Sequence, residues 1–219
     1  AIGYTVEAFY KTFNQLVEYK DGADLFVNKQ LETELLPASG FAYGIELGLT
    51  KDIGKLTGRL NYTFSRSKRK TTSTHKSENI NGGAYFSSNF DRPHVGNMSL
   101  QYPINKRLSL QTFFTYQSGR PITHAIGRFT LHGKEYIQYS DRNAFRLPNV
   151  HRLDISFILK SKNKKGKLKS SNWTFGVYNV YGRSNALTRF SNFHGGKLRT
   201  YDFSPIGSPI PFISKNISF

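Results

Sequence analysis

Residues 41–50 alternate without exception between apolar side chains and polar or small ones. Every odd position holds an aromatic or aliphatic residue, whereas the even positions hold Ala, Gly, Glu, Gly and Thr. Successive side chains of a β-strand point to opposite faces, whereas the apolar stripe of a helix recurs every three or four residues. The pattern therefore predicts a strand with one apolar and one polar face, and it excludes a helix.

The same two-residue period recurs along the chain and predicts an all-β fold. Phe (18) and Tyr (13) are abundant while Met and Trp occur once each, a balance that favours strands over helices. The first segment mixes inward and outward positions, so its phase stays open. The eight expected strands are residues 4–20, 41–50, 55–65, 97–104, 108–117, 152–160, 173–181 and 209–219.

Short and long connections alternate between these segments. The expected short turns are residues 51–54, 105–107 and the Lys-rich 161–171. The expected long loops are residues 21–40, 66–90, 118–150 and 182–208. Outer-membrane barrels have this layout, with short periplasmic turns and long outer loops. The alternative is a soluble β-sandwich, which the terminal strand alone would suit equally well.

Aromatic positions discriminate between the two architectures. Three pairs lie on the apolar face at the long-loop ends of their strands, where an interfacial girdle of a barrel is expected: Phe41 and Tyr43, Tyr62 and Phe64, and Phe114 and Tyr116. We therefore expect a transmembrane antiparallel β-barrel. Its lumen would receive the charged residues in mid-strand on the polar face, which are Glu46, Arg59, Arg152 and Asp154.

The net charge of +17 raises the question of an anionic partner. One basic cluster, with Arg66, Lys68, Arg69 and Lys70, falls in the long loop 66–90, and a second follows residue 160. The first is a candidate contact for lipopolysaccharide phosphates, and plain solvated loops are the alternative. Nucleic acid is not expected as a partner because no basic–aromatic groove motif appears.

Catalytic and metal chemistry find no support in the sequence. The six His residues form no close pair and Cys is absent, so neither a metal site nor a cofactor is expected. There is no nucleophile-elbow motif, so no enzyme activity is predicted. No stretch of 18 apolar residues predicts a transmembrane helix, and no signal peptide is evident.

Several stretches resemble the carboxy-terminal part of TonB-dependent outer-membrane transporters of the kind abundant in Bacteroidetes, which includes the SusC-like proteins. Together they extend from residue 41 to the end of the chain. They are residues 42–47 (AYGIEL), 89–94 (NFDRPH), 116–123 (YQSGRPIT), 143–148 (NAFRLP), 151–154 (HRLD), and 178–180 (YNV) with Asn185.

That resemblance implies a roughly 22-stranded barrel with a plug in its lumen. Residues 1–219 would then be the carboxy-terminal portion of the barrel, and the plug domain is not present in this chain. The terminal aromatic Phe219, together with Ile217, resembles the signal that the barrel-assembly machinery recognises. Ligand-binding residues are left unknown, because in this family they come largely from the plug and loops.

The expected function is uptake of a bulky nutrient, such as a glycan, peptide or metal chelate, across the outer membrane of a Gram-negative bacterium. The expected partners are outer-membrane lipids, lipopolysaccharide, the assembly machinery, TonB and a surface lipoprotein. The alternative is a barrel without transport activity that serves a complex for secretion, assembly or lipoprotein handling. A free-standing eight-stranded barrel is a third hypothesis.

Overall fold

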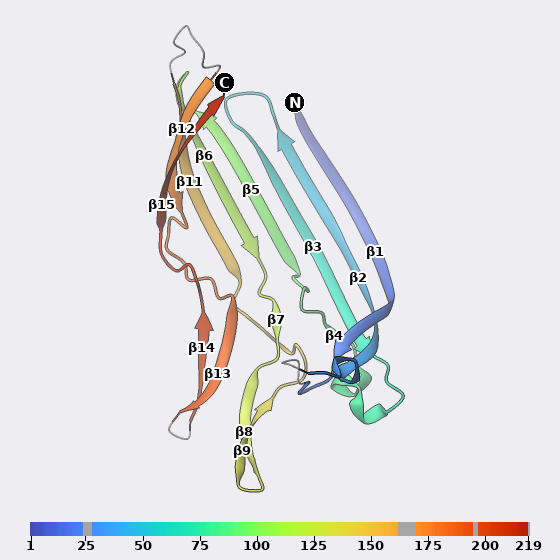
Figure 1. Ribbon diagram of the computed structural model, residues 1–219. Helices are drawn as coiled ribbons and strands as arrows, with labels where there is room; N and C mark the ends of the chain where they lie inside the picture. The colour runs from blue at the N-terminus through green and yellow to red at the C-terminus, as the bar shows by residue number, and fades with distance from the viewer. Residues whose placement is uncertain (24–27, 162–169, 195–196, 219) are drawn as a thin grey trace.

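The computed structural model describes residues 1–23, 28–161, 170–194 and 197–218, and the fold is all-β with one large antiparallel sheet (Figure 1). A short strand, β4 (Phe86–Ser87), extends this sheet by pairing with β3. The other eight strands are, in spatial order, β1 (Ile2–Tyr19), β2 (Leu35–Lys51), β3 (Thr57–Thr71), β5 (His94–Pro103), β6 (Leu108–Gln117), β11 (Val150–Lys160), β12 (Ser170–Tyr178) and β15 (Ile210–Ser218).

Each of the eight segments expected from the two-residue period overlaps one of these strands, but several of the expected boundaries were wrong. The expected loop 21–40 ends early because β2 begins at Leu35, and β3 continues to Thr71 instead of ending near residue 65. β12 ends at Tyr178 because Asn179 has a φ of 55°, which takes the chain out of the extended conformation. Residues 162–169 of the Lys-rich turn lie outside the described residues.

The sheet is open in the described part of the chain. β1 and β15 are its two edges, and neither pairs with the other. The two edge strands therefore leave unpaired backbone groups, and the expected closed barrel is not formed by these eight strands alone. The β2–β3 turn and both termini lie at one end of the sheet, at the top of Figure 1.

An irregularity in β1 explains why the phase of the first strand could not be read. Phe13 pairs with Gly40, whereas Leu16 pairs with Ala38, so β1 contains one residue more than β2 over this interval. Such a bulge exchanges the two faces of a strand. Tyr10 and Val17 therefore share the outer face although one position is even and the other odd.

The long loops contain strands that periodicity did not predict. β7 (Pro121–Ile122) pairs with β10 (Phe145–Arg146), β8 (Ala125–Leu131) pairs with β9 (Lys134–Tyr139), and β13 (Thr188–His194) pairs with β14 (Lys197–Phe203). The last two pairs are hairpins that project past the end of the large sheet (Figure 1). The 3-10 helices η1 (Leu31–Glu34), η2 (Lys76–Glu78) and η3 (Ile80–Gly83) occupy the other connections.

A small cluster of buried apolar residues lies at the loop end of the sheet. Leu36, Ile80 and Phe86 form it, and at most 4% of each is exposed. Ile122, Ala125 and Leu147 are also buried, in the long connection between β6 and β11. Along the strands themselves the apolar face is bare: Ile45, Leu47 and Leu49 are 47%, 43% and 45% exposed. The large sheet therefore does not pack its apolar face against any other described element.

Candidate functional site

Strand register gathers the polar residues onto one face of the sheet. Arg59 of β3 pairs with Ser99, Ser99 with Phe113 of β6, and Phe113 with Asp154 of β11, so these residues form one row across four strands. Side chains of directly paired residues lie on the same face. Arg59 and Asp154 therefore share the polar face, as do the residues two positions away on each strand.

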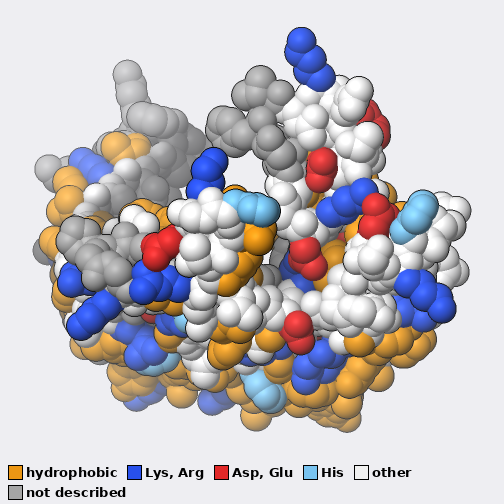
Figure 2. Space-filling view, turned by 90° about the horizontal axis from the view of Figure 1, so that it is seen from below, with side chains coloured by type: hydrophobic (Ala, Val, Ile, Leu, Met, Phe, Trp, Pro, Cys, Tyr) orange, Lys and Arg blue, Asp and Glu red, His pale blue; other side chains and the backbone are white. Residues whose placement is uncertain are grey.

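This polar face is hollowed. A cavity of about 710 Å³ lies along it, and strands β3, β5, β6, β11, β12 and β15 all contribute to its lining. Because one cavity touches six neighbouring strands, the sheet is concave on its polar side. Figure 2 shows the hollow from below, with hydrophobic side chains gathered along the outer margin of the molecule.

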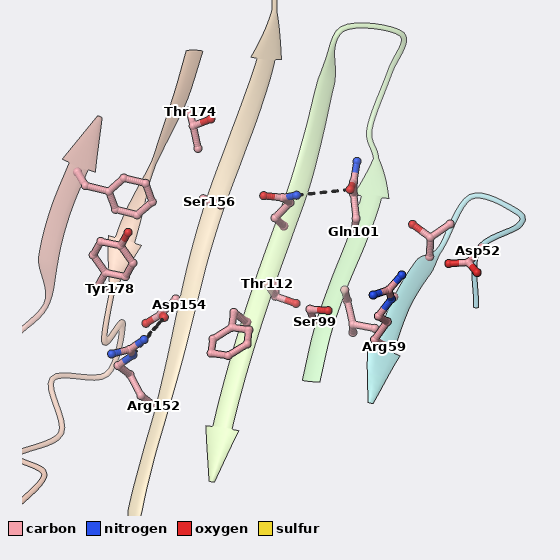
Figure 3. Close-up of a pocket in the computed structure, with 16 residues that line it drawn as sticks. Asp52, Arg59, Ser99, Gln101, Thr112, Arg152, Asp154, Ser156, Thr174 and Tyr178 are labelled. Carbon is pink, nitrogen blue, oxygen red and sulfur yellow. Dashed lines mark hydrogen bonds and ion pairs between the residues drawn. The ribbon is translucent and has the colours of Figure 1, made fainter. Parts of the chain in front are cut away.

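Three of the four residues expected in a lumen line this cavity (Figure 3). They are Arg59, Arg152 and Asp154. Glu46 lies farther along β2, paired with Thr63 on one side and Glu7 on the other. It belongs to the same face but does not line this cavity, and Glu7 places a second carboxylate directly opposite it.

Phe113 is a residue of this face that the two-residue period left unassigned. Thr112 and Phe113 break the apolar–polar alternation, yet β6 pairs regularly with both neighbours through these positions. The strand therefore keeps its phase, and a 38% exposed phenyl ring stands on the polar face. A phenyl ring among amides and guanidinium groups gives the concave face a place for an apolar group.

Asp154 connects the concave face to the chain that leaves β12. Its carboxylate accepts hydrogen bonds from the Arg152 Nε atom at 3.1 Å and from the backbone N–H of Asn179 at 2.9 Å. Asn179 is fully buried, and its side-chain oxygen accepts a hydrogen bond from the Arg183 N–H at 3.1 Å. Arg152 and Asp154 therefore form an ion pair on the concave face that also anchors a turn.

A second constellation lies at the loop end of the sheet, around the buried carboxylate of Asp91. Asp91 accepts hydrogen bonds from the backbone N–H of Ser67 at 2.7 Å and from the Arg66 Nε atom at 3.3 Å, and it forms an ion pair with Arg146. Arg146 also donates to the carbonyl oxygens of Asp91 at 2.7 Å and Gly119 at 2.9 Å. Three stretches that resemble the transporter family thus meet at one point.

Gly119 lies beside the Asp91–Arg146 ion pair, at a position where only a residue without a side chain fits. A Cβ atom built there would overlap the carbonyl group of Leu147. Its N–H donates to the Asn149 side-chain oxygen at 3.0 Å, and the Asn149 amide donates to the Tyr116 hydroxyl at 2.9 Å. These contacts hold the end of β6 against the entry to β11.

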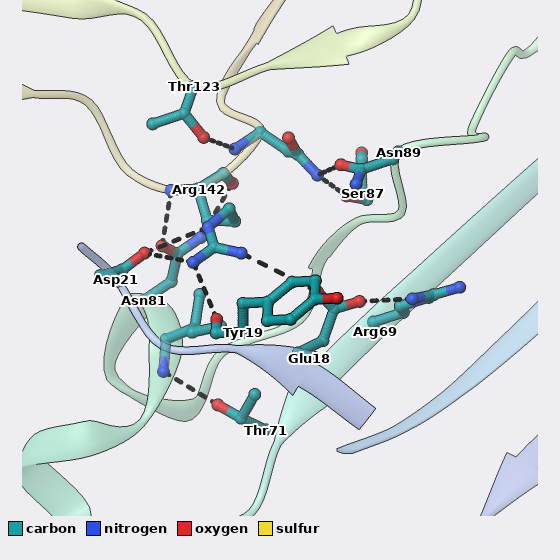
Figure 4. Close-up of polar contacts among 12 residues, drawn as sticks. Glu18, Tyr19, Asp21, Arg69, Thr71, Asn81, Ser87, Asn89, Thr123 and Arg142 are labelled. Carbon is teal, nitrogen blue, oxygen red and sulfur yellow. Dashed lines mark hydrogen bonds and ion pairs between the residues drawn. The ribbon is translucent and has the colours of Figure 1, made fainter. Parts of the chain in front are cut away.

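A third network ties the end of β1 to the loop before β10 (Figure 4). Arg142 donates to the Tyr19 carbonyl at 3.0 Å and to Asp21 at 2.6 Å, and it exchanges two hydrogen bonds with Asn81. Glu18 forms an ion pair with Arg69. Sequence patterns did not identify this network, because its partners lie up to 123 residues apart.

The four basic residues expected to contact lipopolysaccharide lie in β3, not in a loop. Arg66 forms an ion pair with Asp91, and Arg69 forms one with Glu18. Carboxylates of the chain itself therefore neutralise much of these two positive charges. Lys68 donates to the Ser87 hydroxyl at 3.1 Å, and the Lys70 ammonium lies 5.1 Å from the centre of the Tyr85 ring. Only the two lysines therefore remain without a carboxylate partner among the described residues.

The aromatic pairs expected at the loop ends of two strands lie instead in mid-strand, because both strands extend farther towards the loops than expected: Phe41 and Tyr43 lie within β2 (Leu35–Lys51), and Tyr62 and Phe64 lie within β3 (Thr57–Thr71). The Tyr62 hydroxyl lies 2.7 Å from His94 Nδ1. Outside the expected set, the Tyr181 hydroxyl lies 2.8 Å from His151 Nδ1. Phe41 stacks near Tyr10 and Tyr43 with ring centres 6.3 Å apart in each pair. Rings with one polar and one apolar end suit an interface between water and hydrocarbon.

At the other end of the sheet, the terminal strand places Ile217 on the outer face with 44% of its surface exposed. Lys215 interrupts this face, and its ammonium lies 5.0 Å from the centre of the Trp173 ring. Phe219, the other part of the expected assembly signal, lies outside the described residues.

None of the helices in the described residues is long and apolar enough to cross a membrane. Those residues also contain no group of three or more His, Cys, Asp or Glu side chains placed to hold a metal ion. Comparison with family models, curated proteins and solved structures found no match for this chain.

Proposed function

We propose that this chain forms the last strands of a TonB-dependent, SusC-like outer-membrane barrel that takes up a bulky nutrient. The observation that carries the proposal is the contrast between the two faces of one curved sheet. The concave face holds Arg59, Arg152 and Asp154 around a cavity, whereas the convex face is apolar and bare. In a soluble sandwich the apolar face would be the inner one.

We expect the exposed apolar face of the large sheet to lie against an apolar environment. Soluble monomers rarely expose contiguous apolar patches larger than a few hundred Å². Here exposed aliphatic and aromatic side chains follow one another along β1, β2, β3, β12 and β15; they include Val6, Leu47, Leu60, Phe175 and Ile213. Lipid acyl chains would cover such a surface, and the polar face would then meet a water-filled lumen.

The open edges support a barrel larger than eight strands. β1 and β15 each leave one edge unpaired in the described residues, and membrane barrels have no free edge in hydrocarbon. Further strands of the same barrel, with β15 closing on the first of them, would satisfy both edges. Barrels of about 22 strands with a plugged lumen are known among outer-membrane transporters.

Trp173 allows a direct test of lipid exposure. It is the single Trp of the chain, lies on the convex face and pairs with Lys215. We expect brominated lipids to quench its emission when the full-length protein is folded into vesicles, with a Trp173→Phe variant supplying the background from elsewhere in the protein. Quenching by aqueous iodide but not by brominated lipid would reject the membrane-facing assignment.

Transport needs its own experiment, because a barrel can also serve a secretion or lipoprotein-handling complex. Cells that carry the full-length gene should lose energised uptake of a nutrient when the gene or its TonB-contacting segment is deleted. If the reading frame encodes neither a plug nor such a segment, the protein is a subunit without transport activity.

A further inference from the structure

A second cavity, of about 520 Å³, lies at the loop end of the concave face. It shares Phe113 and Arg152 with the larger cavity, so the two form one continuous groove. Its lining comes from β5, β6 and β11 and from the segments that follow β4, β6, β10, β12 and β14. All of its lining residues belong to the described part of the chain.

Three guanidinium groups and no carboxylate line this second cavity. Arg152 is neutralised by Asp154, with 2.8 Å between its Nη2 atom and the carboxylate. Among the described residues, Arg92 and Arg120 form no ion pair with any carboxylate. The cavity therefore carries two uncompensated positive charges.

Neutral partners hold these two guanidinium groups in place. Arg92 donates to the side-chain oxygen of Gln117, and Arg120 donates twice to the Leu187 carbonyl, at 3.2 and 3.1 Å. A guanidinium has five N–H donors, so each group retains donors for a ligand. Two guanidinium groups that are held in place and keep free N–H donors suit the oxygens of a carboxylate, sulfate or phosphate group.

The two cations also disfavour each other's charge. Burial, and then the positive charge of Arg120, lowers the pKa of the Arg92 guanidinium. The group remains protonated at neutral pH, because guanidinium pKa values lie far above it. Burial and the second cation therefore raise the free energy of the charged Arg92 in the empty site, and a bound anion would lower it.

The remaining lining is mostly apolar. Leu147, Pro148, Val150, Leu187, Pro205 and Ile206 contribute to it, and the Phe113 ring stands where the two cavities join. Pockets for organic ligands commonly combine such walls with a few polar groups that fix the orientation. An inorganic anion alone would leave these walls unused.

We propose that Arg92 and Arg120 bind the acidic group of an amphipathic organic anion, whose apolar body lies against Leu147, Leu187 and Phe113. The site rests on the proposed transport function, and it narrows the nutrient class from any bulky solute to one that carries a carboxylate, sulfate or phosphate group. Arg152 is not part of the anion site, because Asp154 already neutralises its charge.

Calorimetric titration of the purified full-length protein in detergent tests the site with three probes. We expect naphthalene-2-sulfonate to bind, the neutral naphthalene-2-sulfonamide to bind at least about tenfold more weakly, and inorganic sulfate to bind more weakly than the sulfonate. Higher NaCl concentration should weaken only the binding of the charged probes. Equal affinity for sulfonate and sulfonamide, or no binding of either, would overturn the proposal.

Variants locate the site within the protein. The double variant Arg92→Gln, Arg120→Gln should lose about tenfold in sulfonate affinity for each guanidinium removed, while Arg199→Gln on the exposed β14 strand should bind as the unaltered protein does. Unchanged binding by a correctly folded double variant would reject the assignment. If that variant does not fold, the probe comparison on the unaltered protein still decides.

Heat-modifiable migration of the same preparations separates the two proposals. A folded outer-membrane barrel that binds neither probe contradicts the anion site alone. A protein that never enters the outer membrane contradicts the barrel itself.

Discussion

Arg146 and Asp91 lie 55 residues apart and join β10 to the turn before β5 through an ion pair whose carboxylate is wholly buried. Arg146 reaches this carboxylate from β10, and a second nitrogen of the same guanidinium donates to the Asp91 carbonyl at 2.7 Å. Ser67 of β3 donates a third hydrogen bond from its backbone. One carboxylate therefore fixes the relative positions of three chain segments that enter or leave the sheet.

Replacing Asp91 by Asn should destabilise the loop end of the sheet strongly. The change leaves the Arg146 guanidinium without its buried counter-charge, and removing one partner of a buried pair costs about 3–5 kcal/mol. The measurement is the free energy of unfolding in urea, followed by heat-modifiable migration. Asp21→Asn is the matched control, because Asp21 is 65% exposed and its pair with Arg142 should contribute about 0–1 kcal/mol. Similar losses in both variants would contradict the proposed role of Asp91.

Gly119→Ala should destabilise the same joint for a different reason. The new methyl group would overlap the Leu147 carbonyl, so the chain before β11 would have to shift, at a cost of about 1–3 kcal/mol. Gly3→Ala provides the comparison, because nothing lies within 4 Å of a Cβ atom built at Gly3. The urea midpoints of the two variants report the difference. An unaltered midpoint for Gly119→Ala would mean that the Leu147 segment adapts freely.

The two ends of the sheet should lie on opposite sides of the outer membrane. Asp52 is exposed in the turn between β2 and β3, and Ser77 is exposed in η2 at the opposite end. The chain contains no Cys, so a single introduced thiol can be assigned. An impermeant thiol reagent added to intact cells should label Ser77→Cys and leave Asp52→Cys unlabelled until the outer membrane is opened. The reverse labelling would invert the topology.

The strands of the large sheet could be predicted because the side chains of its two faces differ in polarity. Where one side is apolar and the other polar, the sequence alternates, as in residues 41–50. The hairpins β8–β9 and β13–β14 escaped prediction because neither has a buried face. On one face, Phe129 and Tyr136, and Phe190 and Tyr201, are all more than 40% exposed. On the other face, the pairs Thr130–Glu135 and Ser191–Thr200 are exposed or half-buried. Without a buried face, a strand has no reason to alternate.

The charged networks and the second cavity could not be predicted from the sequence, for a different reason. Asp91, Arg92 and Arg120 are ordinary residues of two separate loops until β5 and β6 bring those loops together. The structure gives the partner of Asp91 as Arg146, which no local spacing identifies. Side-chain pairing across long sequence separations depends on strand order, which periodicity leaves open.

Our last prediction compares two changes in the terminal strand. Lys215 stands on the apolar face beside Trp173, at about 9 Å above the strand end for a rise of about 3.3 Å per residue and a tilt near 45°. So near the interface its ammonium can reach the headgroups, and the cost of a Lys there is about 0–1 kcal/mol. Its contact with the Trp173 ring contributes about 0.5–1 kcal/mol, so the two effects nearly cancel. Lys215→Leu should therefore change stability by less than about 1 kcal/mol.

Deletion of Phe219 should have a much larger effect on assembly, because the resemblance assigns the terminal aromatic to recognition by the assembly machinery. The measurement for both variants is the amount of heat-modifiable, folded barrel in outer-membrane fractions, with total protein as the reference. We expect folded barrel to fall sharply for the deletion and to remain near the unaltered level for Lys215→Leu. Undiminished folded barrel after the deletion would separate the terminal residue from assembly, and a sharp loss for Lys215→Leu would mean that Lys215 contacts protein in place of lipid.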